Sequence, residues 1–203
     1  MDKSIKNKEG IINVKTCDFS YRYVKWFCEW KGSTILWKFS KDSWKYSKIA
    51  WMGKEKKCWI VHIQEAHRKN DADFKVRPVH AVAGTWGSDF IEELYPEEGE
   101  YIVRKRRHSG FAYTDLDLYL REENIDTVVV TGAWTNVCVR STATDALARA
   151  YKVITLSDGT TSKTEEMHQY GLNDLSIFSK VMTIDEYIDA WEKGLDPWEG
   201  GGD

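Results

Sequence analysis

A cysteine follows an apolar run and lies near the start of a predicted helix. The stretch VVVTGAWTNVCVRSTATDALARA begins at Val128, and Cys138 comes shortly after the run that ends at Gly132. Unpaired backbone N–H groups and the helix dipole favour a negative charge at a helix start. We therefore expect a lowered pKa for the Cys138 thiol and a thiolate able to attack a carbonyl group. The alternative is a small side chain that only fills space beside a sheet.

A lysine ends a second apolar run. The run YIVRK covers residues 101–105, and RRHSGF follows it. A lysine at the end of a strand could stabilise the thiolate or protonate a leaving amine. The alternative is a solvated surface charge, because three arginines adjoin Lys105 in the sequence. Taken alone, this lysine is a weak indication of a catalytic site.

Two further stretches supply a carboxylate and two imidazoles. QEAH (64–67) contains Glu65 and His67, and PVHAVAGT (78–85) contains His80. Glu65 and His67 alternate along one side of an extended segment, and His80 follows after a loop. One carboxylate with two histidines can bind a divalent metal. The alternative is three polar loop residues with no shared ligand.

These residues need a scaffold, and the pattern from Trp59 onward predicts an α/β fold. Short β-branched runs predict strands at 59–64, 101–105, 126–132, 152–157 and 180–183. Helical patterns lie between them at 87–95, 114–124, 137–151 and 164–178. Apolar strands that alternate with helices indicate a parallel sheet covered on both faces. Ligands bind beyond the carboxyl ends of such strands, where Lys105 and Gly132 lie.

The overall composition is that of an ordinary globular protein. The chain has 203 residues, 42% of them hydrophobic and 30% charged, with a formal net charge of −3. Neither this charge nor any apolar run indicates a nucleic-acid or membrane partner, and the first residues lack the apolar core of a signal peptide. The four cysteines do not have metal or disulfide spacing. We expect a reduced, cytoplasmic protein.

The charge is unevenly distributed, which divides the chain. Residues 1–58 contain fourteen Lys and Arg against six Asp and Glu, whereas residues 59–203 contain fifteen against twenty-six. We interpret residues 1–58 as an atypical N-terminal segment, residues 59–192 as the main domain and residues 193–203 as a flexible tail. A basic, Trp-rich segment could also be an adaptor for nucleic acid or a membrane surface.

Residues 59–192 resemble the isochorismatase-like cysteine hydrolases, a family that includes the nicotinamidases. The resemblance rests on HIQEAH, HAVAGTWGSDFIEEL, VRKRRHSGFAYTDLDLYLRE and DTVVVTGAWTNVCVRSTATDALARAYKVITLSDG, in this order. It implies a three-layer, doubly wound sheet of about six mostly parallel strands with helices on both faces. It also implies that the protein is a homo-oligomer.

The resemblance assigns catalytic roles. Cys138 matches the nucleophile that attacks an amide or similar C–N carbonyl and forms an acyl-enzyme. Lys105 matches the catalytic lysine of the family. The backbone N–H groups of Trp134 and Cys138 match the oxyanion hole, and the bond between Ala133 and Trp134 matches a cis peptide. True isochorismatases lack the cysteine, so its presence favours the amidase side of the family.

The resemblance also bears on the metal. His67 and His80 match two metal ligands of the nicotinamidase branch, and Glu65 occupies the position where that branch has aspartate. A glutamate has a longer side chain but can still coordinate a metal. Glu65, His67 and His80 are therefore candidate ligands of a divalent metal such as zinc.

The catalytic aspartate of the family has no clear counterpart. In the family it follows the first strand in a motif like IDMLNDF, whereas the nearest stretch here is IINVKTCDF, in which Asp18 is a possible substitute base. A shift of one nucleotide across the codons of residues 17–31 permits the string AIFLIDMLNGFVNG. We hypothesise that roughly residues 13–58 are an out-of-frame translation, which replaces the first strand and helix. The alternative is a genuine, diverged N-terminus.

The sequence therefore predicts a cysteine-dependent hydrolase of a small amide, such as nicotinamide, through an acyl-enzyme on Cys138. Its only expected partners are the small-molecule amide and further copies of the chain. The alternative is a catalytically inactive member of the fold that acts as a binding or assembly protein, because the family's aspartate is not found.

Overall fold

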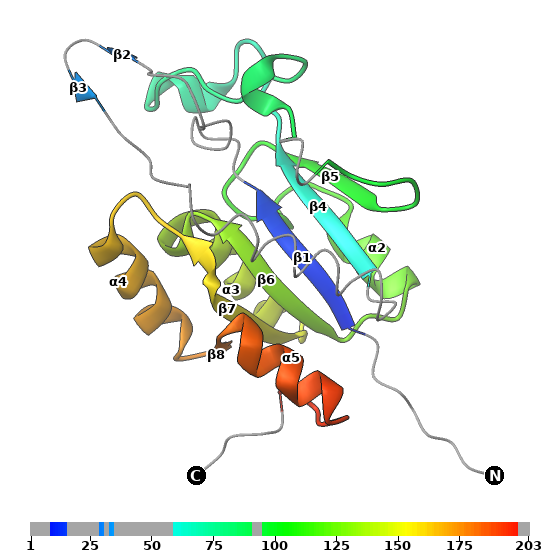
Figure 1. Ribbon diagram of the computed structural model, residues 1–203. Helices are drawn as coiled ribbons and strands as arrows, with labels where there is room; N and C mark the ends of the chain where they lie inside the picture. Colours follow the sequence, from blue (N-terminus) through cyan, green and yellow to red (C-terminus); the bar gives the residue numbers. More distant parts are fainter. Residues whose placement is uncertain (1–8, 16–28, 31–32, 35–58, 91–94, 199–203) are drawn as a thin grey trace.

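The computed structural model describes residues 9–15, 29–30, 33–34, 59–90 and 95–198. Within them, six parallel strands form one sheet in the order β5-β4-β1-β6-β7-β8 (Figure 1). The strands are β1 (Glu9–Lys15), β4 (Trp59–Glu65), β5 (Tyr101–Lys105), β6 (Thr127–Ala133), β7 (Lys152–Thr161) and β8 (Lys180–Met182). A separate antiparallel pair joins β2 (Glu29–Trp30) to β3 (Ser33–Thr34). The predicted α/β fold is confirmed.

Helices connect the strands and cover the sheet. They are α2 (Leu116–Glu122), a π-helical turn η4 (Thr135–Val139), α3 (Arg140–Ala148), α4 (Glu165–Leu175) and α5 (Ile184–Glu192). Two short 3-10 turns, η1 (Ala72–Lys75) and η2 (Trp86–Ser88), lie between β4 and β5. Because parallel neighbours need crossovers, α2, α3 and α4 return the chain to the start of the next strand, whereas α5 follows the last strand.

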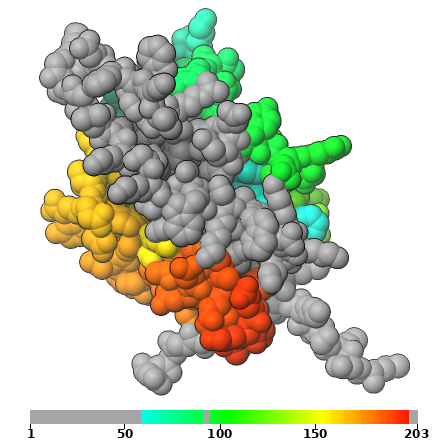
Figure 2. Space-filling view, viewed as in Figure 1, coloured from blue at the N-terminus to red at the C-terminus, as the bar shows by residue number. Residues whose placement is uncertain are grey.

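The strand β6 buries both of its faces. Val128 and Val130 belong to a buried cluster with residues of α2, α3 and α4, whereas Val129 belongs to a second cluster with residues of α5. This alternation follows from the two-residue period of a strand. In Figure 1, α5 crosses in front of the sheet while α2 and α3 lie behind it. In Figure 2, α5 and α4 form two parts of the outer surface in the same view.

The strand β1 lies at the centre of the sheet and was not predicted. It pairs in parallel with β4 on one side and β6 on the other, so that Val14 is level with Ile63 and Gly132. We expected the main domain to begin at Trp59, but the sheet also includes residues 9–15. Most of the segment in the reading-frame hypothesis, including Asp18, lies outside the described residues.

The C-terminal helix was also missed, although its sequence contains a start signal. Thr183 and Glu186 form a capping box, in which each side chain accepts a hydrogen bond from the other residue's backbone N–H. The apolar positions of α5 then pack on the sheet around Ile154. The expected tail from residue 193 continues this packing as far as Trp198, and Asp196 pairs with Lys152 at 3.1 Å.

The remaining predicted elements agree with the structure where it describes them. The helix expected at 87–95 overlaps η2, and its residues 91–94 lie outside the described part. Among the described helices, none has the length and apolar character needed to cross a membrane.

The helix α4 packs unusually closely against η4 through Gly171. A Cβ atom added at Gly171 would lie 2.8 Å from the backbone nitrogen of Asn136 and 3.0 Å from its Cα. These are backbone atoms, so the contact cannot be relieved by a side-chain rotation. Gly171 therefore sets the distance between α4 and the turn that carries Cys138.

We predict that Gly171→Ala lowers the free energy of unfolding by about 1–3 kcal/mol, because overpacking displaces η4. Helix propensity alone would predict a gain of about 1 kcal/mol. Denaturant unfolding of Gly171→Ala and of Asn173→Ala, an exposed position on the same helix, separates the two effects. A Gly171→Ala variant as stable as the Asn173→Ala control would contradict the close packing.

Candidate active site

The ends of two neighbouring strands bring Lys105 beside Glu65. Glu65 ends β4 and Lys105 ends β5, and the two residues are paired in the parallel register of these strands. The backbone N–H of Ala66 donates to the carbonyl of Lys105 at 2.9 Å, which extends the pairing by one residue. Lys105 Nζ lies 3.8 Å from Glu65 Oε2, and both side chains are almost fully buried. The lysine is therefore a buried cation and not a surface charge.

Cys138 reaches the same place from β6. This strand ends at Ala133, and the π turn η4 then carries Cys138 back over its carboxyl end. The carbonyl of Trp134 accepts hydrogen bonds from the N–H groups of Val137 (3.0 Å) and Val139 (3.2 Å), which close the turn. The peptide bond between Ala133 and Trp134 is cis, as the family resemblance implies. Trp134 and Cys138, the expected oxyanion-hole residues, thus belong to one turn.

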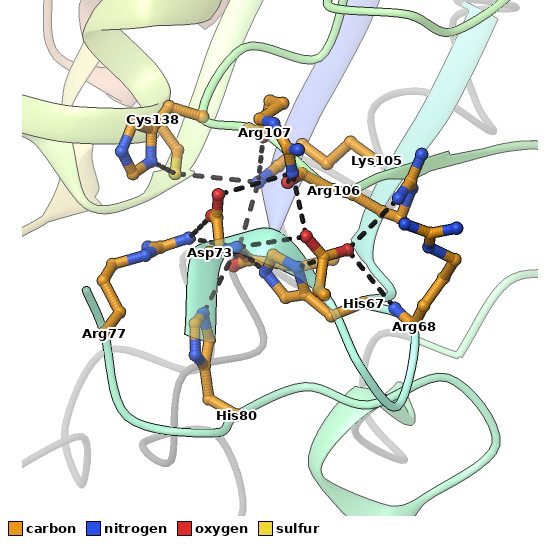
Figure 3. Close-up of polar contacts among 12 residues, drawn as sticks. His67, Arg68, Asp73, Arg77, His80, Lys105, Arg106, Arg107 and Cys138 are labelled. Atoms are coloured by element: carbon orange, nitrogen blue, oxygen red, sulfur yellow. Dashed lines mark hydrogen bonds and ion pairs between the residues drawn. The ribbon is translucent and has the colours of Figure 1, made fainter. Parts of the chain in front are cut away.

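The thiol of Cys138 contacts the lysine directly. Lys105 Nζ lies 3.6 Å from Cys138 Sγ and 3.1 Å from the carbonyl oxygen of Arg107 (Figure 3). Burial nevertheless raises the pKa of the Cys138 thiol to about 11, against the attraction of the Lys105 ammonium. The expected lowering of this pKa is therefore wrong. A helix start favours the thiolate, but removal of the sulfur from water costs more here.

A histidine that the sequence analysis did not single out also contacts the sulfur. His108 Nδ1 lies 3.8 Å from Cys138 Sγ. Burial lowers the pKa of His108, and the positive charges of Arg77 and Lys105 lower it further, so its imidazole is neutral at pH 7. His108 belongs to the RRHSGF stretch after β5, and only the folded chain shows that this stretch passes Cys138.

The loop after β4 returns to bring the two other histidines together. His67 and Val82 form an isolated parallel bridge, in which the N–H of His67 donates to the carbonyl of Ala81 at 2.8 Å. His80 is thereby brought to a ring-centroid distance of 4.7 Å from His67. The ring of Phe74 packs against both imidazoles.

Glu65, His67 and His80 converge on one point. Their ligand atoms all lie within 4.8 Å of one another. Glu65 Oε1 is 3.0 Å from His67 Nε2 and 3.6 Å from His80 Nε2. Burial acts to raise the pKa of Glu65, but Lys105 and the two histidines hold it well below its usual range. The carboxylate is therefore ionised between two imidazoles.

The outer nitrogens of these histidines fit a metal site. His80 Nδ1 lies 2.7 Å from the carbonyl of Pro78, to which it must donate a proton. His67 Nδ1 faces Asp71 Oδ2 at 3.4 Å. With both Nδ1 atoms protonated, each Nε2 would offer a lone pair to a cation beside Glu65. The pKa of His80 is raised, chiefly by its hydrogen bond to Glu65.

Charged residues that the sequence analysis missed surround this cluster. The buried carboxylate of Asp71 accepts hydrogen bonds from Arg106 (3.2 Å) and Arg107 (3.1 Å). Burial acts to raise the pKa of Asp71, but these donors and the backbone N–H of Asp73 keep it ionised. Arg77 pairs with Asp73 and also lies 3.7 Å from Glu65 Oε1. A metal would therefore share Glu65 with a guanidinium group.

The sequence model of the Isochorismatase domain family matches residues 47–186 of the chain. The chain belongs to the isochorismatase family. Solved structures agree with this membership. An isochorismatase-like hydrolase from Alkaliphilus metalliredigens is 63% identical, with a TM-score of 0.79 over 91% of this chain and 99% of that one. A pyrazinamidase from Pyrococcus horikoshii, solved in complex with zinc, is 26% identical with a TM-score of 0.69 over 87% and 99% of the two chains.

Curated relatives of this isochorismatase-family protein include amidohydrolases. A ureidoacrylate amidohydrolase from Methylobacterium radiotolerans is 40% identical over 96 residues, which are 47% of this chain and 37% of that protein. The chain spans about half or less of the length of the curated relatives it matches.

The contact between Lys105 and Cys138 leads to a prediction about the thiol. Lys105→Met keeps the apolar stem but removes the ammonium, so the pKa of Cys138 should rise above about 11, by roughly one pH unit or more. The thiolate absorbance at about 240 nm, followed against pH and taken as the difference from the corresponding Cys138→Ala protein, measures this pKa. Lys193→Met, at an exposed lysine, is the matched control and should change nothing. An unchanged pH profile in Lys105→Met would contradict the contact.

Substitutions at the metal site are predicted to change zinc affinity in opposite directions. Zinc should bind and raise the melting temperature, and His67→Asn or His80→Asn should abolish this rise, because each removes one ligand. Arg77→Met should instead strengthen zinc binding, because it removes a positive charge from Glu65. Isothermal titration with zinc measures both effects, and His62→Gln on the same strand is the control. Zinc affinity that is unaffected by either histidine variant would place the ion elsewhere.

Proposed function

We propose that the protein hydrolyses the C–N bond of a small amide through an acyl thioester on Cys138. The observation that carries this proposal is the buried contact between Lys105 Nζ and Cys138 Sγ at the carboxyl edge of the sheet. Burial of a nucleophile beside a fixed cation lowers the stability of a fold, and such a pair is typical of a catalytic site. The amidohydrolase names of relatives support the same class of reaction.

The chemistry follows from the positions of three groups. The sulfur of Cys138 attacks the carbonyl carbon of the amide, and the carbonyl oxygen becomes negatively charged. The N–H groups of Trp134 and Cys138, which lie in one turn, stabilise this oxyanion. The Lys105 ammonium stabilises the negative charge that develops on sulfur during the attack and again as the acyl group leaves. The oxyanion then collapses, the C–N bond breaks and the amine leaves with the proton that the thiol lost. Water hydrolyses the thioester, which releases the acid and restores the thiol.

Glu65, His67 and His80 would hold a divalent metal such as zinc next to this centre. When bound, such an ion supplies a Lewis acid that can bind a donor atom of the substrate. The residues of the chain set its position, because Glu65 contacts both His67 and the catalytic lysine.

One observation favours a second function, that of an inactive binding protein. Among the residues that the structure describes, the side chains in hydrogen-bond contact with Cys138 Sγ are those of Lys105 and His108, and neither is a carboxylate. With a pKa of about 11, the free thiol carries little thiolate at pH 7. Asp18 remains the candidate substitute base, outside the described residues.

The test is turnover together with capture of the intermediate. We predict that the protein releases ammonia or an amine from one of a panel of small amides that includes ureidoacrylate and nicotinamide. Rapid acid quenching should reveal an acyl group on the Cys138 peptide by mass spectrometry. Cys138→Ala should abolish both signals, because an alanine at this position cannot form the thioester.

Lys193→Ala is the control, because Lys193 is an exposed lysine with no proposed part in the reaction. Turnover that survives in Cys138→Ala would disprove the covalent route. A wild-type protein that binds an amide without turnover would support the binding function.

A further inference from the structure

We propose that His108 is the proton acceptor for Cys138 and returns this proton to the leaving amine. This inference rests on the proposed hydrolase function and adds a residue to it. His108 touches the reacting sulfur, with Nδ1 3.8 Å from Sγ. In the tautomer that carries its proton on Nε2, the Nδ1 lone pair faces the thiol.

The position of His108 is fixed by the helix that follows Cys138. The loop after β5 is tied to α3 where the N–H of Gly110 donates to Thr142 Oγ1 at 2.9 Å. The next residue, Phe111, donates its N–H to Ser109 Oγ at 3.1 Å and is itself buried. Since α3 continues directly from η4, the same helix positions both the sulfur and the loop that bears the imidazole.

The other side chains described near the sulfur do not accept this proton. Lys105 is held as an ammonium between the Glu65 carboxylate and the carbonyl of Arg107, and an ammonium has no lone pair. Glu65 contacts Lys105, His67 and His80, and not the sulfur. Within the described part of the chain, His108 is thus the group on Sγ that can accept a proton.

The charges around His108 keep its imidazole neutral, so that it can accept a proton. Burial lowers its pKa, the positive charges of Arg77 and Lys105 lower it further, and Glu65 and Asp73 oppose them. The ring is therefore neutral at pH 7. The thiol, with its raised pKa, is neutral too. The pair rests uncharged, and the proton moves only as the bond to carbon forms.

The proton is conserved through the reaction. As the S–C bond forms, the S–H proton passes to Nδ1 and the carbonyl becomes an oxyanion. When the oxyanion collapses, the C–N bond breaks and the imidazolium gives its proton to the leaving nitrogen. In the second half, His108 takes a proton from water as it attacks the thioester, and then returns a proton to the departing sulfur.

Alkylation of Cys138 tests the proposal without a known substrate. With iodoacetamide, the wild-type rate should fall as the pH drops through the depressed pKa of His108, because the protonated ring no longer accepts. At pH 7, His108→Ala should react roughly tenfold more slowly or worse, and its rate should rise with pH until the thiol itself ionises near pH 11. Added imidazole should restore part of the rate. A His108→Ala rate within twofold of wild type from pH 6 to 9 would overturn the proposal.

Turnover provides a second measurement. His108→Ala should lower kcat about 100-fold and leave KM within a few-fold, because it affects proton transfer and not binding. Melting temperatures of His108→Ala and His108→Gln establish that both variants are folded. His62→Gln is the control, since His62 lies on β4 with its side chain on the face opposite Ile63.

Asp18→Asn distinguishes the two possible bases. If Asp18→Asn removes the neutral-pH reactivity of Cys138 and His108→Ala does not, Asp18 is the base and the proposal for His108 is wrong, although the hydrolase function stands. If Cys138→Ala retains full turnover, the proposed function fails, while the alkylation profile still decides whether His108 accepts the proton.

Discussion

The buried ammonium of Lys105 is the interaction on which the rest of the site depends. A lone charge removed from water is very unfavourable, so the fold has to surround it with compensating groups. Glu65 supplies the opposite charge at 3.8 Å, the carbonyl of Arg107 accepts at 3.1 Å, and the sulfur of Cys138 lies at 3.6 Å. The register of β4 and β5 makes this possible, because it ends both strands at the same level.

The need to compensate buried charge also explains why so many charged residues surround Glu65. One carboxylate is shared by Lys105, Arg77 and two histidines, so the cluster holds more potential positive charge than Glu65 can balance. Asp71 and Asp73 supply the rest through Arg106, Arg107 and Arg77. Whether a metal, a proton or Arg77 occupies the space beside Glu65 is therefore an electrostatic competition and not a matter of shape alone. Each choice changes the field that reaches Lys105 and hence the sulfur.

The sequence predicted those parts of the structure that depend on local pattern. The five strands from Trp59 onward follow from apolar runs, and the parallel arrangement follows from the helices between them. Cys138, Lys105 and the Glu65 cluster lie at strand ends or in adjoining loops, where a parallel sheet places its ligands. The capping box formed by Thr183 and Glu186 is also a local pattern, and it predicts the start of α5.

Other features depend on contacts that no local pattern contains. The strand β1 is as long as β4 and β6 but is flanked by charged residues, and its place is decided by the two strands that enclose it. His108 becomes important only because Gly110 ties its loop to Thr142. The pKa of Cys138 was predicted in the wrong direction, because the sequence shows a helix start but does not show how completely the sulfur is buried.

The position of β1 also limits how the N-terminal part of the chain can take part in catalysis. This strand lies between β4, which ends in Glu65, and β6, which leads to the turn of Cys138. Its last residue, Lys15, is level with Gln64, one position before Glu65. The carboxyl end of β1 therefore lies between the two strands that lead to the two halves of the site. A base supplied by the sequence after β1 would be an alternative to His108 as the acceptor of the Cys138 proton.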